Sequence, residues 1–290
     1  MNNPRSLHIG TCSWKYDSWR GLIYPDEGRI NHLLHYSRHY RTVEVDQWFW
    51  SLFDGDTAVL PKPEVVREYG ESVPEDFIFC IKVPNSITLT HRYNKDRQGP
   101  LRANPCFLSI PLMQRFLETL EPIRDRLGPL IFQFEYLNRK KMNSLGAFIN
   151  RFGAFARQLP DGYTYCVETR NPNYLKKPYF EFLHGQRLRH VFLHGYYMPS
   201  IFEIYQQFRN LIEEKTVIRL HGPNRQEIEK QVQNDWSSIV APKDTDIDQL
   251  AAMLRELSQQ DVETFLYVNN HFEGSAPRTI ARIESMLAQG

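Results

Sequence analysis

Short apolar runs recur along the 290-residue chain. Most are followed by a short polar segment and then by a stretch whose apolar residues have helical spacing. The runs are seven to nine residues long and rich in β-branched and aromatic residues, which is typical of buried strands. They cover residues 7–13, 42–50, 77–83, 129–136, 163–170, 190–196, 216–222 and 264–272. The pattern therefore predicts eight strands.

Amphipathic stretches, with apolar residues three or four positions apart, separate most of these runs. Asn31 and Asn143 are suited to cap the helices that follow them, and Gly128 is suited to end one. Pro199 fits the first turn of a further helix. The predicted helices cover residues 31–40, 111–128, 143–160, 199–214, 246–260 and 276–288.

Strands that alternate with helices pair in parallel through right-handed crossovers. Eight such units predict an α/β fold, a single (β/α)₈ TIM barrel over residues 1–290. The alternative is an open doubly wound sheet, but "GTCSW" at the end of the first run is not a GxGxxG phosphate loop. The connection after the third strand is the longest, and we expect its residues 84–110 to form a lid above the barrel mouth.

Polar residues in these runs lie near the C-terminal ends of the strands. Side chains two apart share a face of a strand. The pairs are Glu44 and Asp46, Cys80 and Lys82, Gln133 and Glu135, Glu168 and Arg170, Arg219 and His221, and Asn269 and His271, and His194 adds a single residue. Because all strand C-termini of a barrel meet at one mouth, where barrel enzymes have their active sites, the sequence predicts a ligand or catalytic site there.

Three of these residues are suited to proton transfer. Glu44 and Glu168 are candidates for general acid and base, and His221 titrates near neutral pH when unperturbed. Two carboxylates across a mouth also suit a retaining glycosidase, but the sequence does not give their separation.

The other polar residues are suited to binding. Arg170 and Arg219 match the fork geometry that carboxylates and phosphates prefer, and Lys82 adds a positive charge. The amides of Gln133, Asn269 and Asn270 would orient the ligand. We expect an anionic or sugar-like small molecule and acid–base chemistry of the hydrolase or isomerase type.

Two other chemistries have weaker signals. A divalent metal is an alternative, but its candidate ligands lack HExxH or another compact spacing. They are Glu44, Glu168, His194, His221 and His271. Cys12 ends the first strand, where a small buried residue is more usual than a nucleophile. No cofactor is firmly indicated.

The net charge is +1, from 35 basic and 34 acidic residues, which argues against extensive contacts with nucleic acid. A nucleic-acid-binding or repair protein remains the alternative, and it would use an arginine-rich part of the insertion. Those residues are Arg92, Tyr93, Lys95, Arg97 and Arg102. A non-catalytic ligand-binding barrel is the third hypothesis.

Four cysteines without CxxC spacing indicate reduced thiols and a cytoplasmic protein. The N-terminus shows no apolar signal-peptide region, and no uncharged apolar run is long enough to span a membrane. The oligomeric state is not indicated.

Several of these segments together resemble the YecE-like family, a domain of unknown function with the number 72. The matching segments are "IGTCSW", "WRGLIYP", "TVEVDQWFW", "FIFCIKVPNSITLTH", "GPLIFQFEY", "CVETRNP", "IRLHG" and "YVNNHFEGSAP". The resemblance implies a TIM barrel without an established activity.

The resemblance also implies a shared cluster at the barrel mouth, formed by Glu44, Lys82, Gln133, Glu168, Arg170, Arg219, His221, Asn269 and Asn270. Cys12-Ser13 stands where the family pattern has Ser-Gly, and Asn171-Pro172 stands where it has His-Pro. The first departure weakens the case for Cys12 as a nucleophile.

Overall fold

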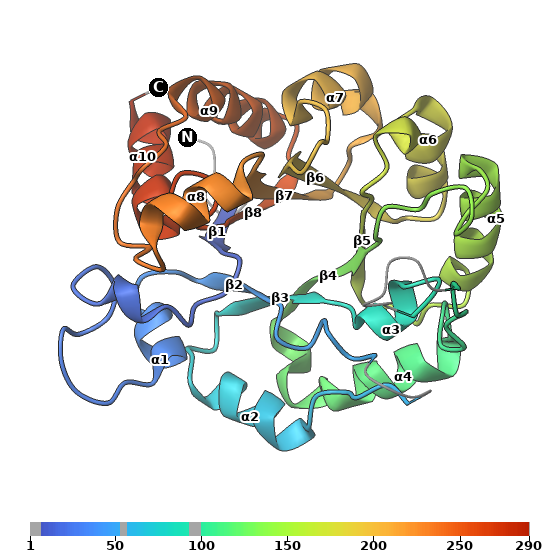
Figure 1. Ribbon diagram of the computed structural model, residues 1–290, viewed down its shortest axis with the longest axis horizontal. Coiled ribbons are helices and arrows are strands. Elements are labelled where there is room, and N and C mark those ends of the chain that lie inside the picture. The colour runs from blue at the N-terminus through green and yellow to red at the C-terminus, as the bar shows by residue number, and fades with distance from the viewer. Residues whose placement is uncertain (1–6, 53–56, 93–99, 290) are drawn as a thin grey trace.

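Eight parallel strands form a nearly closed barrel with helices around it (Figure 1). The computed structural model describes residues 7–52, 57–92 and 100–289. The strands are β1 (Leu7–Thr11), β2 (Thr42–Val45), β3 (Ile78–Lys82), β4 (Leu127–Gln133), β5 (Thr164–Glu168), β6 (Arg189–Gly195), β7 (Lys215–Gly222) and β8 (Glu263–Val268). The structure confirms the predicted TIM barrel.

The outer layer consists of helices in the connections between strands. They are α1 (His32–Tyr36), α2 (Pro63–Glu71), α3 (Asn85–Thr88), α4 (Ile110–Thr119), α5 (Leu145–Ala156), α6 (Lys177–Gly185), α7 (Ile201–Phe208), α8 (Arg225–Val232), α9 (Asp244–Gln259) and α10 (Ala276–Ala288). Short 3₁₀ turns are η2 (Asp17–Trp19), η3 (Glu121–Arg126), η4 (Pro172–Tyr174) and η5 (Arg209–Leu211).

Three predicted helix boundaries are wrong. Ser144, not Asn143, caps α5, because its hydroxyl oxygen accepts the Ala147 N–H. The helix expected to end at Gly128 instead ends at Thr119, since Pro122 lacks an N–H and the chain continues as the 3₁₀ turn η3. Pro199 precedes Ser200, the N-cap of α7, and therefore lies outside its first turn.

Four helices were not predicted, namely α2, α3, α6 and α8. Two of them are short and bury only two residues each, so they offer few apolar positions in the sequence. In α2 only Val66 and Gly70 are buried, and in α8 only Ile228 and Val232. α3 has four residues, which is barely more than one turn.

The barrel closes at the seam between β1 and β2 without a backbone ladder in the described residues. The Tyr36 hydroxyl fills this seam: it accepts a hydrogen bond from the Thr11 N–H (2.9 Å) and donates one to the Thr42 carbonyl (2.9 Å). Gly10 permits the close approach, because a Cβ there would lie 2.2 Å from the Thr42 oxygen. One buried side chain therefore links two strands that share no ladder.

A compact group of small and aromatic side chains fills the barrel, separate from the larger core between strands and helices. It comprises Cys12, Cys80, Ile131, Cys166, Val191, Val217, Phe265 and Tyr267. Because side chains two positions apart share a face, Lys82, Gln133, Glu168 and Arg219 form the next layer toward the C-terminal ends. Arg219 is therefore buried because its face of β7 lines the inside of the barrel.

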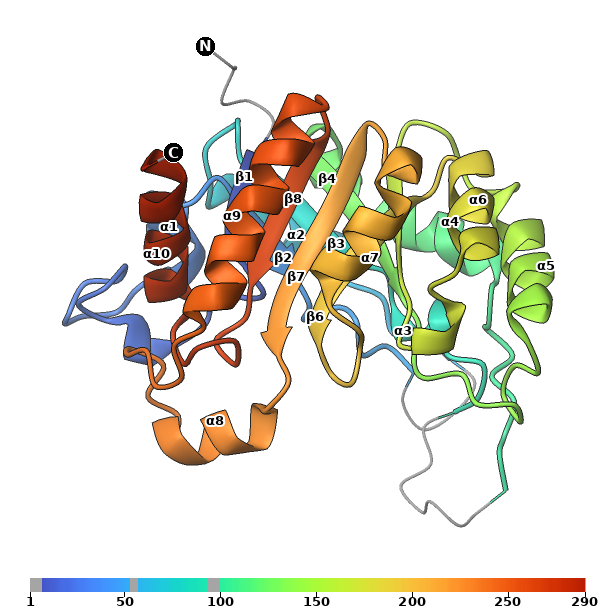
Figure 2. The same cartoon turned by 90° about the horizontal axis from the view of Figure 1, so that it is seen from above.

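The strand arrows point toward one end of the barrel, where α8 lies (Figure 2). The described part of the predicted lid includes α3 and a bridge between His91 and Ala103. The Asn104 amide donates to the carbonyls of Ser86 and Leu89 and holds this segment together. Of the residues suggested for nucleic-acid binding, Tyr93, Lys95 and Arg97 lie outside the described ranges.

Candidate functional site

A chain of five alternating charges crosses the barrel at the C-terminal ends of the strands. Its order is Lys82, Glu44, Arg219, Glu168 and Arg170. Lys82 Nζ lies 3.3 Å from a Glu44 oxygen, and Arg170 Nε donates to Glu168 over 2.7 Å. Four different strands and the loop after β5 supply these residues, so the fold alone brings the five charges together.

Arg219 is the centre of this charge chain and is fully buried, as are Glu44 and Glu168. Its Nε and Nη2 donate to the two oxygens of Glu44, over 2.5 and 2.7 Å. Its Nη1 donates to Glu168 and also to the Gln133 amide oxygen, 3.3 Å away. The guanidinium is thus committed to partners within the protein.

The terminal cations of the charge chain keep unused donors. The Arg170 and Lys82 side chains are 19% and 11% exposed, whereas Arg219 has no exposed surface. Within the described residues, the two terminal nitrogens of Arg170 have no hydrogen-bond partner. Solvent and ligands can therefore reach the ends of the charge chain but not its centre.

Both glutamates remain ionised in this environment. Burial alone would raise the pKa of Glu168, but Arg170, Arg219 and Lys82 outweigh it and lower the pKa to about 2. Burial likewise opposes ionisation of Glu44, and Arg219 and Lys82 lower its pKa nevertheless. Three cations against two carboxylates leave the charge chain with one excess positive charge.

Tyr196 joins the two polar residues at the edge of the charge chain. The Arg170 guanidinium lies over the Tyr196 ring at 4.4 Å from its centre, a cation–π contact. The Tyr196 hydroxyl lies 3.0 Å from His221 Nδ1. Tyr196 therefore contacts both the Arg170 guanidinium and the His221 imidazole.

The backbone that carries Tyr196 is in a left-handed conformation over three successive residues. The φ angles of Gly195, Tyr196 and Tyr197 are 118°, 54° and 64°. A Cβ on Gly195 would lie 2.3 Å from the Gly222 oxygen, so the last residues of β6 and β7 touch backbone to backbone. Such conformations cost free energy in non-glycine residues and cluster at functional sites.

His221 is held neutral. Burial lowers its pKa well below the ordinary value, and Arg219, Arg170 and Lys82 lower it further. Its Nε2 lies 3.8 Å from the Cys12 sulfur, which also lies 3.8 Å from Glu44. Burial and then Glu44 raise the pKa of Cys12, so this cysteine remains a thiol.

Asp46 is the carboxylate with the opposite pKa shift. It follows β2 directly and is half-buried. Burial raises its pKa, and Glu44 raises it further against the effects of Lys82 and Arg219. It also contributes to the raised pKa of Tyr16, after burial. A carboxyl group with a raised pKa beside ionised glutamates has the separation of acid and base strengths that proton transfer requires.

Residues 8–290 match the family described as "Protein of unknown function DUF72". The chain belongs to the DUF72 family. It is similar to the UPF0759 protein YecE of Escherichia coli strain K12, with 28% identity over 172 residues, or 59% of this chain and 51% of YecE. The chain thus spans about half the length of that relative.

Two solved structures of DUF72 family proteins have the same fold. The protein from Enterococcus faecalis V583 has a TM-score of 0.69 and 17% identity, over 97% of this chain and 95% of the other. The protein from Thermotoga maritima MSB8 has a TM-score of 0.66 and 21% identity, over 97% and 99% of the two chains. These likenesses show the fold.

In this DUF72 protein, seven of the nine predicted site residues are connected by the contacts described above. Asn269 and Asn270 instead make contacts within their own loop. The Asn269 oxygen accepts the His271 N–H (3.0 Å), and the Asn270 oxygen accepts the Ala276 N–H at the start of α10 (2.8 Å). No hydrogen bond in the described part of the chain joins either residue to the charge chain.

The five residues suggested as metal ligands have separate partners. His194 lies 3.3 Å from Asp246, and His271 lies 3.0 Å from Glu229. Arg219 lies between Glu44 and Glu168. Among the described residues, no three His, Cys, Asp or Glu side chains are placed to hold a metal ion together.

Sequence reasoning did not select Asp46 or Tyr196 as site residues. Asp46 could have been selected, because it shares a face with Glu44 in the expected strand. Tyr196 carried no such signal, since its position depends on the left-handed backbone of its loop.

None of the described helices is long and apolar enough to cross a membrane.

Proposed function

We propose that this DUF72 protein is an enzyme that binds an anionic, sugar-like small molecule at the C-terminal mouth of its barrel. The reaction is an acid–base reaction of the hydrolase or isomerase type. The observation that carries the proposal is the charge chain, with its two partly exposed cationic ends. The four cysteines, which show no CxxC spacing, support a reducing, cytoplasmic setting.

Arg170 and Lys82 bind the anionic group of the substrate. Each has donors that no group among the described residues uses, and burying a cation with unused donors is costly unless a ligand completes its hydrogen bonds. Arg219 does not bind the substrate directly. It is a positioning residue, because its contacts with Glu44 and Glu168 fix the carboxylates that hold Lys82 and Arg170.

Proton transfer belongs to Asp46 and His221. Glu44 and Glu168 have lowered pKa values and are therefore weak bases. The raised pKa of Asp46 makes this residue the better proton donor or acceptor. An anion bound to Arg170 and Lys82 would offset the positive charge that lowers the pKa of His221, so substrate binding would make this imidazole more basic.

The test is a binding screen that distinguishes the effect of the ligand's charge from the effect of its shape. Sugar phosphates and sugar acids are compared with the matching neutral sugars, by isothermal titration calorimetry and thermal unfolding. The variants are Arg170→Met and Lys82→Met, with Lys176→Met as the control. Lys176 is an exposed cation on the same side of the barrel with no ion-pair partner among the described residues.

We expect an anionic sugar to bind at least tenfold more tightly than its neutral counterpart. Arg170→Met and Lys82→Met lose this preference, and Lys176→Met keeps it. Equal binding of neutral sugars, or equal behaviour of Arg170→Met and Lys176→Met, would contradict the anion site. Once a substrate is found, Asp46→Asn should lower kcat at least a hundredfold and leave the dissociation constant nearly unchanged. Binding without turnover in the parent protein would instead support a non-catalytic barrel.

A further inference from the structure

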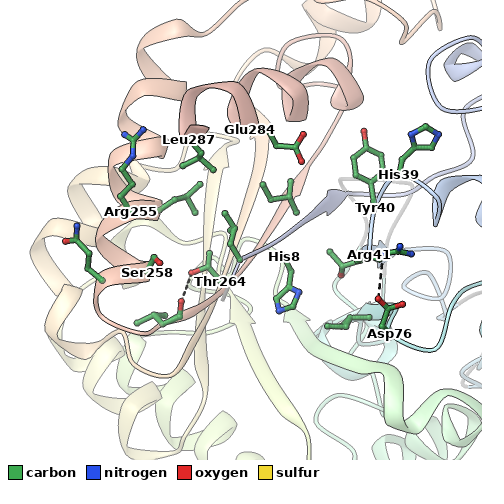
Figure 3. Close-up of a pocket in the computed structure, with 17 residues that line it drawn as sticks. His8, His39, Tyr40, Arg41, Asp76, Arg255, Ser258, Thr264, Glu284 and Leu287 are labelled. Atoms are coloured by element: carbon green, nitrogen blue, oxygen red, sulfur yellow. Dashed lines mark hydrogen bonds and ion pairs between the residues drawn. The ribbon is translucent and has the colours of Figure 1, made fainter. Parts of the chain in front are cut away.

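A cavity lies at the opposite end of the barrel from the charge chain. It has a volume of about 860 Å³, within the range of small-molecule sites. The first residues of β1, β2 and β8 line it together with α9 and α10 (Figure 3). It therefore lies beside the seam where β1 and β2 share no ladder, and no part of the proposed active site contributes to it.

Part of the cavity wall is apolar. Leu7 and Ile9 of β1 lie on one side, and Leu254 and Leu287 of the two helices lie on another. Val262, just before β8, is buried and completes this wall. Such a surface is suited to the hydrocarbon part of a ligand.

Most charged groups around the cavity already have partners. Arg41 lies 3.7 Å from Asp76. The imidazole of His8 lies 3.1 Å from Glu263, outside the cavity lining, and Arg255 donates to the Met286 carbonyl over 2.7 Å.

Glu284 is the exception. This carboxylate on α10 has no hydrogen-bond or ion-pair partner among the residues that the structure describes. Glu284 is exposed on α10, and partial burial of its carboxyl group raises its pKa.

Glu284 and Tyr40 face each other across the cavity. In Figure 3 the Glu284 carboxylate extends from α10 toward the Tyr40 hydroxyl, which comes from the segment before β2. No hydrogen bond joins the two groups, although Glu284 contributes to the raised pKa of Tyr40, after burial. A donor placed between them could satisfy both.

We propose that this cavity binds a hydrophobic amine. The ammonium group lies between the Glu284 carboxylate and the Tyr40 side chain, and the hydrocarbon part lies against Leu254 and Leu287. An ammonium has three donors, enough for the carboxylate and the phenol oxygen together. A carboxylate ligand is disfavoured, because it would be placed beside an unpaired glutamate.

The test uses three probes of one length, hexylamine, hexanol and hexanoate, titrated into the purified protein at neutral pH by calorimetry. We expect saturable binding of hexylamine, about tenfold weaker binding of hexanol, and the weakest binding for hexanoate. Glu284→Gln should weaken hexylamine binding about tenfold and leave hexanol binding unchanged. Unchanged hexanol binding also shows that this variant retains the cavity.

Two further variants make the result specific. Glu118→Gln removes an exposed carboxylate on α4, away from the cavity, and should leave all affinities unchanged. Leu287→Trp fills the cavity and should abolish binding of every probe. The proposal is overturned if hexylamine does not saturate, if hexanoate binds as tightly, or if Glu284→Gln behaves like Glu118→Gln. None of these outcomes depends on the anion site at the other end of the barrel.

Discussion

Arg219 and Glu44 form a bidentate ion pair across the inside of the barrel, with Nε–Oε2 and Nη2–Oε1 distances of 2.5 and 2.7 Å. Arg219 is on β7 and Glu44 is on β2, on opposite sides of the seam that the backbone ladders leave open. The pair therefore connects the two sides of the seam directly. It also fixes the carboxylates on which Lys82 and Arg170 depend, so barrel closure and the geometry of the candidate site share the same contacts.

Removing the Arg219 guanidinium should strongly destabilise the protein. Arg219→Met leaves two buried carboxylates without their central partner, and breaking a buried pair in this way typically costs about 3–5 kcal/mol. We expect a loss of this size in the free energy of unfolding, measured by urea denaturation at pH 7.

The compensating variant separates charge from packing. Arg219→Met combined with Glu44→Gln and Glu168→Gln removes the two buried carboxylates and leaves only the partly exposed cations Lys82 and Arg170, so it should recover at least half of the lost stability. If the triple variant is no more stable than Arg219→Met, packing rather than charge accounts for the effect.

Acid should weaken the contribution of Glu168 in a defined pH range. Its folded-state pKa of about 2 lies below the ordinary value of 4.5, so the folded state disfavours protonation. The stability that this carboxylate contributes is fully present above about pH 4.5 and is lost as the pH falls toward 2. The shift corresponds to roughly 3 kcal/mol.

The measurement compares urea unfolding of the parent and of Glu168→Gln between pH 7 and pH 2.5. We expect the stability difference between the two proteins to shrink progressively below pH 4.5. Glu118→Gln provides the matched control on an exposed helix surface. A difference that stays constant down to pH 2.5 would exclude a lowered pKa for Glu168.

The fold could be predicted because its signals are local. Eight apolar runs mark eight strands, and the alternation of side chains placed Lys82, Glu168 and Arg219 on the inner face. Short helices with few buried residues, such as α2 and α8, offer few apolar positions and were missed. The exact ends of α4 and α5 depended on Pro122 and Ser144, single residues that a pattern of apolar positions does not weigh.

The composition of the site was easier to predict than its connections. That Arg219 is saturated by Glu44 and Glu168, while Arg170 keeps unused donors, depends on distances across the barrel. A strand pattern gives the face of a side chain but not its partner on another strand. The same limit applies to Tyr196, which reaches His221 through an unusual loop conformation.

The Tyr36 hydroxyl should matter more than an ordinary buried phenol. Tyr36→Phe leaves the Thr11 N–H and the Thr42 carbonyl without their bridging partner at the seam, and unsatisfied buried groups cost about 1–3 kcal/mol. We expect a loss of this size in the free energy of unfolding.

The control is Tyr174→Phe, because the Tyr174 hydroxyl makes only a long hydrogen bond of 3.5 Å to the Ser144 carbonyl. It should cost less than about 1 kcal/mol. Hydrogen exchange adds a local measurement, since the Thr11 amide should lose protection in Tyr36→Phe and keep it in Tyr174→Phe. Equal effects of the two substitutions on stability and exchange would show that the seam does not depend on this hydroxyl.

Gly195 should tolerate no side chain. Its φ of 118° disfavours L-residues, and a Cβ would lie 2.3 Å from the Gly222 oxygen, which is backbone and cannot move aside as a flexible side chain would. Gly195→Ala should therefore cost about 3 kcal/mol or more in the free energy of unfolding. The damage should extend to the site, because the same loop places Tyr196 against Arg170 and His221.

Gly146→Ala is the matched control, since Gly146 is in α5 and a Cβ there would approach nothing closer than 3.8 Å. It should stabilise the protein by up to about 1 kcal/mol, as alanine favours helices over glycine. The His221 imidazole signals in NMR spectra give the second readout, and they should shift in Gly195→Ala but not in Gly146→Ala. Gly195→Ala could instead unfold like the parent and leave these signals in place. That result would show that the close contact between Gly195 and Gly222 does not restrict this position.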